Sequence, residues 1–531
     1  MTTSGTTARR APLVRATGAT AALTGRGGST AASLLLGVAG VLVALVGAST
    51  VSLWTDEAAT VSAATRSLPE LWALVQRIDA VHAAYYLLVH AWTGLAGTSP
   101  LALRLPSALA VGVAVVGVHR LLVVTGRRDA ALAAALVAVV LPRITWMGIE
   151  ARSFGPSAAV AIWATVLLVT ALRSGGVPRW TGYAALVALG TALNIYVALL
   201  VGAHAVTVAL LGGPGLRRRS AWAVAAVAGV AAASPVVLLA AGQQGQLGDN
   251  DLGVVQILRG VVVNQWFLGG TPTRVDSTAS PTEPWALAAL VLAAVGWALV
   301  LLAVAAGLRP TGEQGRSASR TAVLVLLPVL VVPVVVVVGY SLLVSPLYNP
   351  RYFTFAAPAC AGLVGLGVAS LRRRGLRVVA LALVVLLSVP VWASQRQVTG
   401  KSGTDWSEAA ARVGAGARDG DGVYFAPLDP DPGAVVRRTT DNVAVVYPEA
   451  FDGLVDVTRR TGPLEQDSLR GTSWRLDAPA TKLDEVDRLW VVAPDDDPTG
   501  SVDDRLLEDA GFSEVRSWPG GMTTVEEWRR D

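Results

Sequence analysis

The sequence predicts an all-α polytopic membrane protein that carries a C-terminal α/β domain outside the cytoplasm. Three observations support this fold class. Hydrophobic residues make up 53% of the 531 residues and charged residues only 15%, and the apolar residues come in blocks near the roughly 20 residues that cross a bilayer. Short clusters of arginine separate these blocks. After Ser394 the apolar blocks stop, and helical and strand-like patterns alternate instead.

About eleven transmembrane helices are expected, because each apolar block is close to the length of one span. Residues 1–29 are basic and rich in Gly, Ser, Thr and Ala, which predicts a disordered cytoplasmic N-terminus. The block that begins at Thr30 is long enough to span, so we interpret it as a signal anchor and not as a cleaved signal peptide. The expected spans are residues 31–52, 104–124, 130–147, 154–172, 180–194, 196–211, 221–241, 285–307, 321–344, 353–371 and 377–393.

The arginine clusters predict which side of the membrane each loop faces. With the N-terminus inside, all of them fall in connections on the cytoplasmic side, as the positive-inside rule requires. The transmembrane domain, residues 30–393, then places its first loop, 53–103, and the whole of 394–531 outside. We therefore expect a multi-pass protein of the plasma membrane. The net charge of +5 reflects these clusters and does not indicate nucleic-acid binding. The clusters lie at residues 126–129, 173–179, 215–220, 309–320 and 372–377.

The C-terminal domain, residues 394–531, shows a different pattern. A helical stretch, GTDWSEAAARV, precedes the short strand GVYFAP, and a second strand, DRLWVVAP, precedes a further helix and strand. Such alternation predicts a small α/β domain. It contains no nucleophile–base pairing, no Gly-rich phosphate loop and no cysteine, so we expect it to bind or steer another molecule and not to perform chemistry. Trp406 would serve either as an aromatic binding platform or as a packing residue.

The first external loop is too structured to be a plain connection. The stretch WTDEAA places the acids Asp56 and Glu57 directly after the first apolar block. A short helix is predicted from the N-cap Ser67, and the aromatic stretch HAAYYLLVHAW is too short to span and is typical of an interfacial helix. We expect two juxtamembrane helices that roof a cavity with Asp56 and Glu57 in its wall.

The order of several short motifs resembles a known family. They are WTDEA, HAAYYLLVHAW, SPLALRLPSALAVG, GRRDAALAAALVAVVLP, GIEARSFGP, NPRYF and GTDWSEAAARV. Together they resemble the GT-C superfamily of integral-membrane glycosyltransferases, those related to family 39. Protein O-mannosyltransferases, the lipid A aminoarabinose transferase and the actinobacterial polyprenyl-phosphate-mannose enzymes belong to this group. The resemblance runs from about Trp54 to Tyr424 and implies a GT-C-like fold.

The resemblance also implies site residues. The acid motif of the family matches Asp56 and Glu57, its EAR segment matches Glu150 to Arg152, and its late RY motif matches Arg351 and Tyr352. The chain departs from the family before the aromatic helix, where VHAAYY replaces the usual prolines.

Sugar transfer from a polyprenyl phosphate requires a carboxylate for the acceptor hydroxyl and cations for the departing phosphate. We assign Asp56 as general base, Glu57 as its partner in acceptor binding, and Arg351 with Tyr352 as the phosphate clamp. Arg152 is either a second phosphate contact or an ion-pair partner of Asp56. Attack opposite the phosphate predicts inversion at the anomeric carbon. Further candidates for acceptor or sugar binding are His82, Tyr85, Tyr86, His90, Glu150 and Trp406.

Cofactors and partners follow from the same reading. The single cysteine, Cys360, lies inside an apolar block, so there is no Cys-based zinc site and no disulfide. A divalent cation at the acidic turn Asp249, Asn250 and Asp251 is conceivable but not predicted. The expected partners are the lipid-linked sugar donor, membrane lipids, and a cell-envelope glycan, glycolipid or protein as acceptor, with mannose favoured over arabinose. Two other functions stay open, a lipid or polysaccharide transporter or flippase, and a non-catalytic membrane-anchored assembly protein.

Overall fold

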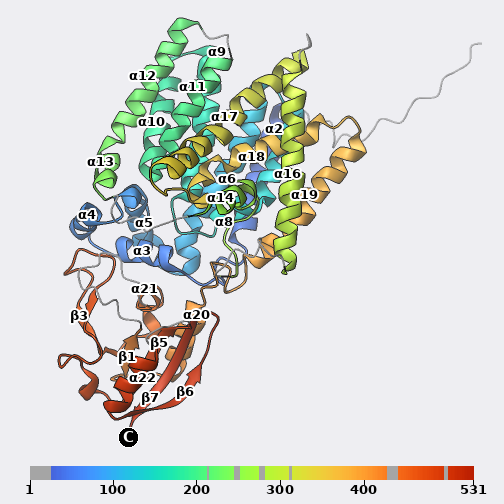
Figure 1. Cartoon of the computed structure of the whole chain (residues 1–531). Helices are drawn as coiled ribbons and strands as arrows, with labels where there is room; N and C mark the ends of the chain where they lie inside the picture. Colours follow the sequence, from blue (N-terminus) through green and yellow to red (C-terminus); the bar gives the residue numbers. More distant parts are fainter. Residues whose placement is uncertain are drawn as a thin grey trace, which may run out of the picture.

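The computed structural model describes residues 26–211, 215–243, 252–273, 282–309, 314–426, 440–495 and 500–531. A large helical part extends to Ser394, and a smaller region with a β-sheet follows from Trp406 and lies at one end of the helices (Figure 1). This arrangement confirms the predicted combination of a mostly helical chain with a small C-terminal α/β region. Most of the predicted N-terminal segment, residues 1–29, lies outside the described residues.

Every predicted span falls on a helix or on two consecutive helices. Six described helices are long and apolar enough to cross a membrane, or seven if one bent pair counts as a single span, so the number eleven is not confirmed. The main helices of the predicted spans, long and short, are α2 (Arg26–Leu45), α6 (Pro100–Thr125), α7 (Arg128–Val140), α9 (Phe154–Ser174), α10 (Val177–Leu193), α11 (Leu199–Leu210), α12 (Leu216–Ala232), α16 (Pro284–Leu308), α17 (Gln314–Leu343), α18 (Ala357–Ser370) and α19 (Arg374–Ser394).

Breaks at prolines explain why some expected spans are shorter than one helix. The span predicted at 130–147 divides into α7 and α8 (Pro142–Met147), because Leu141 precedes a proline and adopts an extended backbone. The span predicted at 221–241 bends by 50° between α12 and α13 (Ser234–Gly242), where Pro235 follows Ser234. Shorter elements complete the helical part: η2 (Ile195–Ala198), α14 (Val254–Arg259), η4 (Gly260–Asn264), α15 (Gln265–Phe267) and η6 (Pro350–Ala356).

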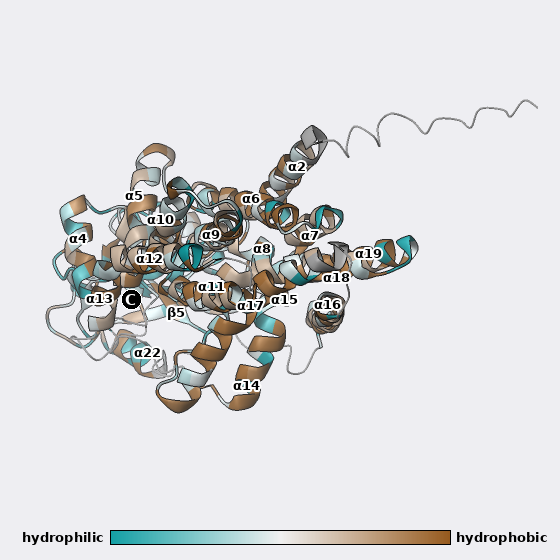
Figure 2. Ribbon diagram, turned by 90° about the horizontal axis from the view of Figure 1, so that it is seen from above, coloured by the Kyte–Doolittle hydropathy of each residue, from teal (hydrophilic) through white to brown (hydrophobic). Residues whose placement is uncertain are grey.

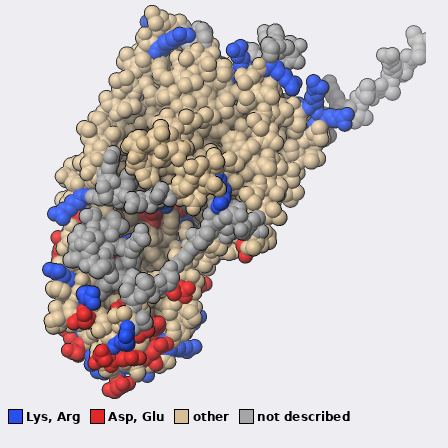
Figure 3. Space-filling view, in the orientation of Figure 1, with Lys and Arg blue, Asp and Glu red and all other residues tan. Residues whose placement is uncertain are grey.

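Small residues allow the helices to pack closely. A Cβ atom on Gly365 of α18 would overlap the backbone of Ala134 on α7, so these two helices meet almost backbone to backbone. Seen from above, apolar residues cover much of the helices, including the outlying α14 and α16 (Figure 2). In the space-filling view, arginines lie at the end of the helices far from the sheet, and a band free of charge separates them from the acidic C-terminal region (Figure 3).

The first loop folds into three helices and one short turn. The two predicted helices exist as α4 (Leu68–Arg77) and α5 (Ala83–Ala96), joined by η1 (Ala80–His82). The backbone N–H of Ser67 donates to the Glu70 carboxylate at 2.9 Å, which caps α4. The third helix, α3 (Thr55–Ala64), was not predicted and carries the acid pair in its first turn, where carboxylates complement the helix dipole.

The C-terminal region is built on a five-stranded mixed sheet of order β2-β1-β5-β7-β6, in which β1 pairs in parallel with β2 and β5. The predicted strands are β1 (Gly422–Phe425), β5 (Arg488–Pro494) and β6 (Phe512–Trp518), and the predicted helices are α20 (Trp406–Gly416) and α22 (Gly500–Asp509). Strand β7 (Thr523–Arg530) was not predicted. The remaining elements are β2 (Val455–Asp456), β3 (Arg459–Thr461), β4 (Thr472–Ser473), α21 (Asn442–Val446), η7 (Pro448–Ala450) and η8 (Leu483–Glu485).

The C-terminal region docks onto the first loop. The Leu53 N–H donates to the Tyr447 hydroxyl at 2.9 Å, and the Ser407 N–H donates to Oγ of Ser52 at 3.1 Å. On α3, Ser62 Oγ donates to the carbonyl of Leu469 at 3.0 Å. The acid-bearing loop is therefore enclosed between the helices and the C-terminal region.

Candidate functional site

The candidate site is centred on Asp56, in the first turn of α3. Nη1 of Arg351 donates to Oδ2 of Asp56 at 2.7 Å, and Nη2 of Arg152 lies 3.6 Å from Oδ1. The three side chains come from α3, from the turn before α9 and from η6, so the fold brings together residues that the sequence separates widely. The Asp56 side chain is 16% exposed, which leaves part of the carboxylate accessible.

Charge pairing sets the protonation of this carboxylate. Burial acts to raise the pKa of Asp56, but the positive charges of Arg351 and Arg152 outweigh burial and hold the pKa below its usual value of 3.8. Asp56 is therefore ionised at neutral pH.

Arg152 is held in place by a second partner. Its Nη1 donates to the Tyr86 hydroxyl at 3.0 Å, and that hydroxyl donates to Oδ2 of Asp79 at 2.6 Å. Tyr86 was predicted as a residue of an interfacial helix, yet it is fully buried. Of the two roles foreseen for Arg152, the geometry supports the one in which it pairs with Asp56.

The side chain of Arg351 is more exposed to solvent than that of Arg152. Its side chain is 28% exposed, and its guanidinium lies 5.5 Å from the ring of Trp54 and 5.7 Å from the ring of Tyr352. The Asn349 side chain accepts the Arg351 backbone N–H at 3.2 Å and so caps η6. Nε of Arg351 is buried and has no hydrogen-bond partner among the described residues. The exposed part of this planar cation suits a phosphate.

Glu57 points away from Asp56 into a closed network of charges. It is fully buried, and its oxygens accept Nε and Nη2 of Arg104 at 2.9 and 2.7 Å and the Ala151 N–H at 2.9 Å. Nζ of Lys401 lies 3.0 Å from the same carboxylate. The predicted contact with an acceptor finds no support in this geometry, because both oxygens are engaged by neighbouring groups and the side chain has no exposed surface. We assign Glu57 a structural role.

Glu150 belongs to the same network. Its oxygens accept Nε1 of Trp54 and Nζ of Lys401, both at 2.6 Å, and its side chain is buried. Burial raises the pKa of the Glu150 carboxyl, against the opposing charge of Lys401. Like Glu57, Glu150 helps to hold the chain segments that carry Asp56 and Arg152. It does not face an open space.

The other predicted residues are spread out. His82 lines a groove beside the site, and burial, followed by the charge of Arg152, lowers its pKa to about 4, so its ring is neutral. Tyr85 is fully buried. His90 Nδ1 lies 3.0 Å from the carbonyl of Ala64 and joins α5 to α3. Trp406 is 9% exposed within an apolar cluster of the first loop and C-terminal region, which supports packing over a sugar platform.

An apolar groove of about 460 Å³ begins next to the site. Ser153 and Tyr352, the sequence neighbours of Arg152 and Arg351, both line it. The groove then runs between η2, α13 and α17, so most of its wall comes from membrane helices. Its lining residues are Val81, His82, Ser153, Phe154, Leu193, Asn194, Ile195, Tyr196, Ala198, Leu199, Val237, Ala240, Ala241, Val336, Val337, Tyr340, Leu347 and Tyr352.

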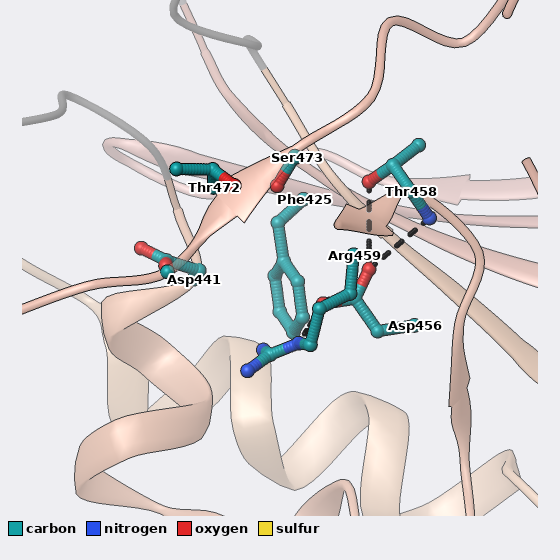
Figure 4. A pocket seen from close by; sticks show the side chains of 8 residues that line it. Phe425, Asp441, Asp456, Thr458, Arg459, Thr472 and Ser473 are labelled. Atoms are coloured by element: carbon teal, nitrogen blue, oxygen red, sulfur yellow. Dashed lines mark hydrogen bonds and ion pairs between the residues drawn. The ribbon is translucent and has the colours of Figure 1, made fainter. Parts of the chain in front are cut away.

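A second hollow lies in the C-terminal region and is lined by Phe425, Asp441, Asp456, Thr458, Arg459, Gly471, Thr472 and Ser473 (Figure 4). Asp456 accepts Nε of Arg459 at 2.9 Å and the Thr458 N–H at 3.2 Å. Its charged groups thus pair locally, and none of its residues contacts Asp56. Within the described parts of the chain, no three His, Cys, Asp or Glu side chains gather as a metal site would require. Asp249, Asn250 and Asp251 lie outside the described residues.

Sequence reasoning missed Arg104 and Lys401. Arg104 stands at the boundary between the first loop and an apolar block, and its position there predicts no more than the end of the loop. Lys401 is one of two lysines in the chain, and it follows the last apolar block by only a few residues. A single lysine so close to the expected membrane surface is the signal that could have identified it.

Comparison with solved structures identifies the architecture. The crystal structures of ArnT from Cupriavidus metallidurans, in the apo state and bound to undecaprenyl phosphate, align with a TM-score of 0.56 over 93% of this chain and 97% of that chain, at 12% identity. The chain has the GT-C fold. The predicted resemblance to the GT-C superfamily is therefore confirmed at the level of the fold.

A family model and a second solved structure are also similar to parts of the chain. A family model described as dolichyl-phosphate-mannose-protein mannosyltransferase matches residues 81–239. The oligosaccharyltransferase of Archaeoglobus fulgidus aligns more weakly, with a TM-score of 0.47 and 11% identity over 87% of this chain and 68% of that chain. No curated protein matches the sequence significantly.

Proposed function

We propose that the protein is a membrane glycosyltransferase that moves a sugar from a polyprenyl-phosphate donor to a hydroxyl group of a cell-envelope acceptor on the extracytoplasmic side. The observation that carries the proposal is the position of Asp56. It is ion-paired with Arg351 and Arg152, and the sequence neighbours of these arginines, Tyr352 and Ser153, line an apolar groove. A base, a phosphate clamp and a lipid path thus meet at one place.

The groove suits the isoprenoid chain of the donor. Its wall is almost entirely aliphatic and aromatic, and it leads to Tyr352 beside Arg351. An isoprenoid lying in it would bring its phosphate to the guanidinium of Arg351, whose 28% exposed side chain leaves room for a charge-assisted bond. The ArnT structure with undecaprenyl phosphate supports this class of donor by likeness of fold.

Donor binding would also activate the base. A phosphate at Arg351 competes with Asp56 for the same guanidinium. Because the charge of Arg351 lowers the pKa of Asp56, drawing Arg351 toward the phosphate raises that pKa toward the range of a useful base. The site would thus couple the presence of donor to the basicity of Asp56.

In the proposed reaction the acceptor oxygen attacks the anomeric carbon opposite the phosphate. The bond from this carbon to the acceptor oxygen forms while its bond to the phosphate oxygen breaks. The hydroxyl proton passes to Asp56, and the polyprenyl phosphate leaves with its charge on Arg351. The configuration at the anomeric carbon inverts, and no covalent sugar–enzyme intermediate is needed.

We propose mannose as the sugar. The description of the family model that matches residues 81–239 favours it, whereas arabinose is the alternative that the sequence left open. The acceptor would be an envelope glycan, glycolipid or protein. A transporter is less well supported, because the charged cluster lies in the external loops and not within the middle of the spans.

The test is a transfer assay in membranes that contain the protein. Membranes are incubated separately with radiolabelled polyprenyl-phosphate mannose and polyprenyl-phosphate arabinose. We expect the mannose label to leave the lipid and appear in an envelope product. Release of arabinose alone would change the sugar but not the class of enzyme, whereas no transfer from either lipid would contradict the proposed function.

A further inference from the structure

Lys401 lies beyond the last membrane helix and yet reaches the interior of the site. It follows α19 by a few residues, and its side chain is only 1% exposed. Nζ lies 2.6 Å from Oε2 of Glu150 and 3.0 Å from Oε1 of Glu57. A buried ammonium group with two carboxylates is costly to assemble and demands close geometry.

Lys401 is not interchangeable with the other cation of the network. Arg104 pairs with Glu57 and otherwise donates to the carbonyls of Ala48, Val51 and Ser52, at 2.6 to 3.1 Å. Among the described residues, Lys401 is the only cation within 4.0 Å of Glu150. Without Lys401, Glu150 would keep only the indole N–H of Trp54 as a partner.

The two carboxylates that Lys401 joins are each next to a residue of the site. Glu57 follows Asp56 in α3, and Glu150 precedes Ala151 and Arg152 in the turn before α9. The Ala151 N–H donates to Glu57 at 2.9 Å, so the two segments already touch there. Lys401 adds a second link between them.

We propose that Lys401 is a positioning residue: by joining Glu57 to Glu150, it fixes the distance between Asp56 and Arg152 that sugar transfer requires. This inference rests on the proposed function and extends it to a residue outside the membrane helices. It makes the segment after α19 part of the active site and not a tether for the C-terminal region.

The backbone around Lys401 is fixed at both ends. The Ser52 N–H donates to the carbonyl of Val398 at 2.9 Å, and the Ser402 N–H donates to the carbonyl of Thr271 at 2.7 Å. Ser402 has a φ of 54°, which a serine adopts only when its surroundings impose it. These contacts hold the ammonium group against the carboxylates.

A further contact links this segment to the sheet. Oδ2 of Asp405 accepts the backbone N–H groups of Gly521, Met522 and Thr523, at 2.8, 2.9 and 3.3 Å, in the turn that leads into β7. Only three residues separate Asp405 from Lys401. The sheet therefore helps to hold Lys401 in position, and a deletion from residue 400 onward would damage the site itself.

The test compares Lys401→Met with Lys482→Met, which removes the other lysine of the chain and serves as the matched control. We measure kcat, the KM for acceptor, and the Kd for donor on purified full-length protein. For Lys401→Met we expect kcat to fall on the order of 100-fold, as a misplaced catalytic group would cause, while the Kd for donor changes less than about threefold. Lys482→Met should match the wild type.

The pH profile separates positioning from a general loss of structure. The groups that face Lys401 are Glu57, Glu150 and Arg104. The charge of Lys401 also lowers the pKa of Asp56. Loss of the ammonium charge raises the pKa of all three carboxyls, so the acid limb of kcat should move to higher pH in Lys401→Met. An unchanged acid limb together with an unchanged kcat would overturn the proposal.

A double variant covers the case in which Lys401→Met does not fold. Lys401→Met with Glu150→Gln removes the carboxylate that would be left without a cation. We expect this protein to fold and to remain on the order of 100-fold slow, because the link to Glu57 is still missing. Wild-type kcat in the double variant would show that Lys401 only neutralises Glu150, and would overturn the positioning role. If the wild type itself transfers no sugar, the proposed function fails first.

Discussion

The guanidinium of Arg351 donates to the Asp56 carboxylate at 2.7 Å although the two residues lie 295 positions apart in the sequence. This contact joins the first loop to the connection that precedes α18. It makes the proposed base and the proposed phosphate clamp parts of one ion pair. Any group that binds Arg351 must therefore change the environment of Asp56.

Arg351→Ala should weaken the donor complex more than it alters acceptor binding. A phosphate that loses a charge-assisted bond loses about 1.5–3 kcal/mol, which corresponds to a Kd roughly 10 to 150 times larger. The measurement is the Kd of the polyprenyl-phosphate sugar on purified protein. Arg475→Ala serves as control, because Arg475 is a well-exposed residue of the C-terminal region. A normal donor Kd in Arg351→Ala would remove the residue from the phosphate site.

The pH dependence should reflect the lowered pKa of Asp56. A carboxyl whose pKa is depressed in the folded state contributes stability above its unfolded pKa and loses it as pH falls through the folded pKa. The midpoint for protonation of Asp56 in the folded protein should therefore lie below pH 3.8. In Arg152→Met one of the lowering charges is gone, so the loss should begin at higher pH. The measurement is kcat as a function of pH. If the acid limb of this profile lies at the same pH in the wild type and in Arg152→Met, the result would contradict this ion pairing.

Glu57→Gln should destabilise the protein instead of weakening acceptor binding. The substitution leaves Arg104 and Lys401 as buried cations with less compensation, and breaking such a buried pair costs about 3–5 kcal/mol. We expect a marked fall in the melting temperature of the purified protein and an unchanged KM for acceptor in whatever folded protein remains. A stable variant with a raised KM would restore the acceptor role that the sequence predicts.

The fold was largely predictable because its signals are local. Apolar length marks each membrane helix, and the alternation after Ser394 marks the α/β region. The number of spans was less predictable, since prolines such as Pro142 divide an apolar block into two helices. Helix α3 could not be predicted, because its residues, TDEAATVSAA, are mostly small and show little amphipathic contrast.

The site was only partly predictable. Asp56, Arg152 and Arg351 could be proposed because the order of short motifs resembles a family, and the structure brings all three together. The roles of Glu57 and Glu150 could not be foreseen, since they depend on cations from α6 and from the segment after α19. Such ion pairs join residues far apart in the chain, and no local pattern encodes them.

The orientation in the membrane is open to a direct test. The arginine clusters predict that the region after Ser394 lies outside the cytoplasm. Alkaline phosphatase fused after Ser394 should therefore be active, and a reporter that works only in the cytoplasm should be silent at the same position. The reverse pattern would place Asp56 on the cytoplasmic side and contradict the proposed location of the reaction.

The most direct test of the central claim is Asp56→Asn, measured for both turnover and donor binding. Asparagine keeps the shape of the side chain but cannot accept the hydroxyl proton, so we expect kcat to fall by about 10²–10⁴-fold. The Kd for the polyprenyl-phosphate sugar should not rise, because the phosphate no longer competes with a carboxylate for Arg351. Asp477→Asn, at an exposed position, should behave as the wild type. Near-normal turnover in Asp56→Asn would show that Asp56 is not the base and would contradict the proposed mechanism.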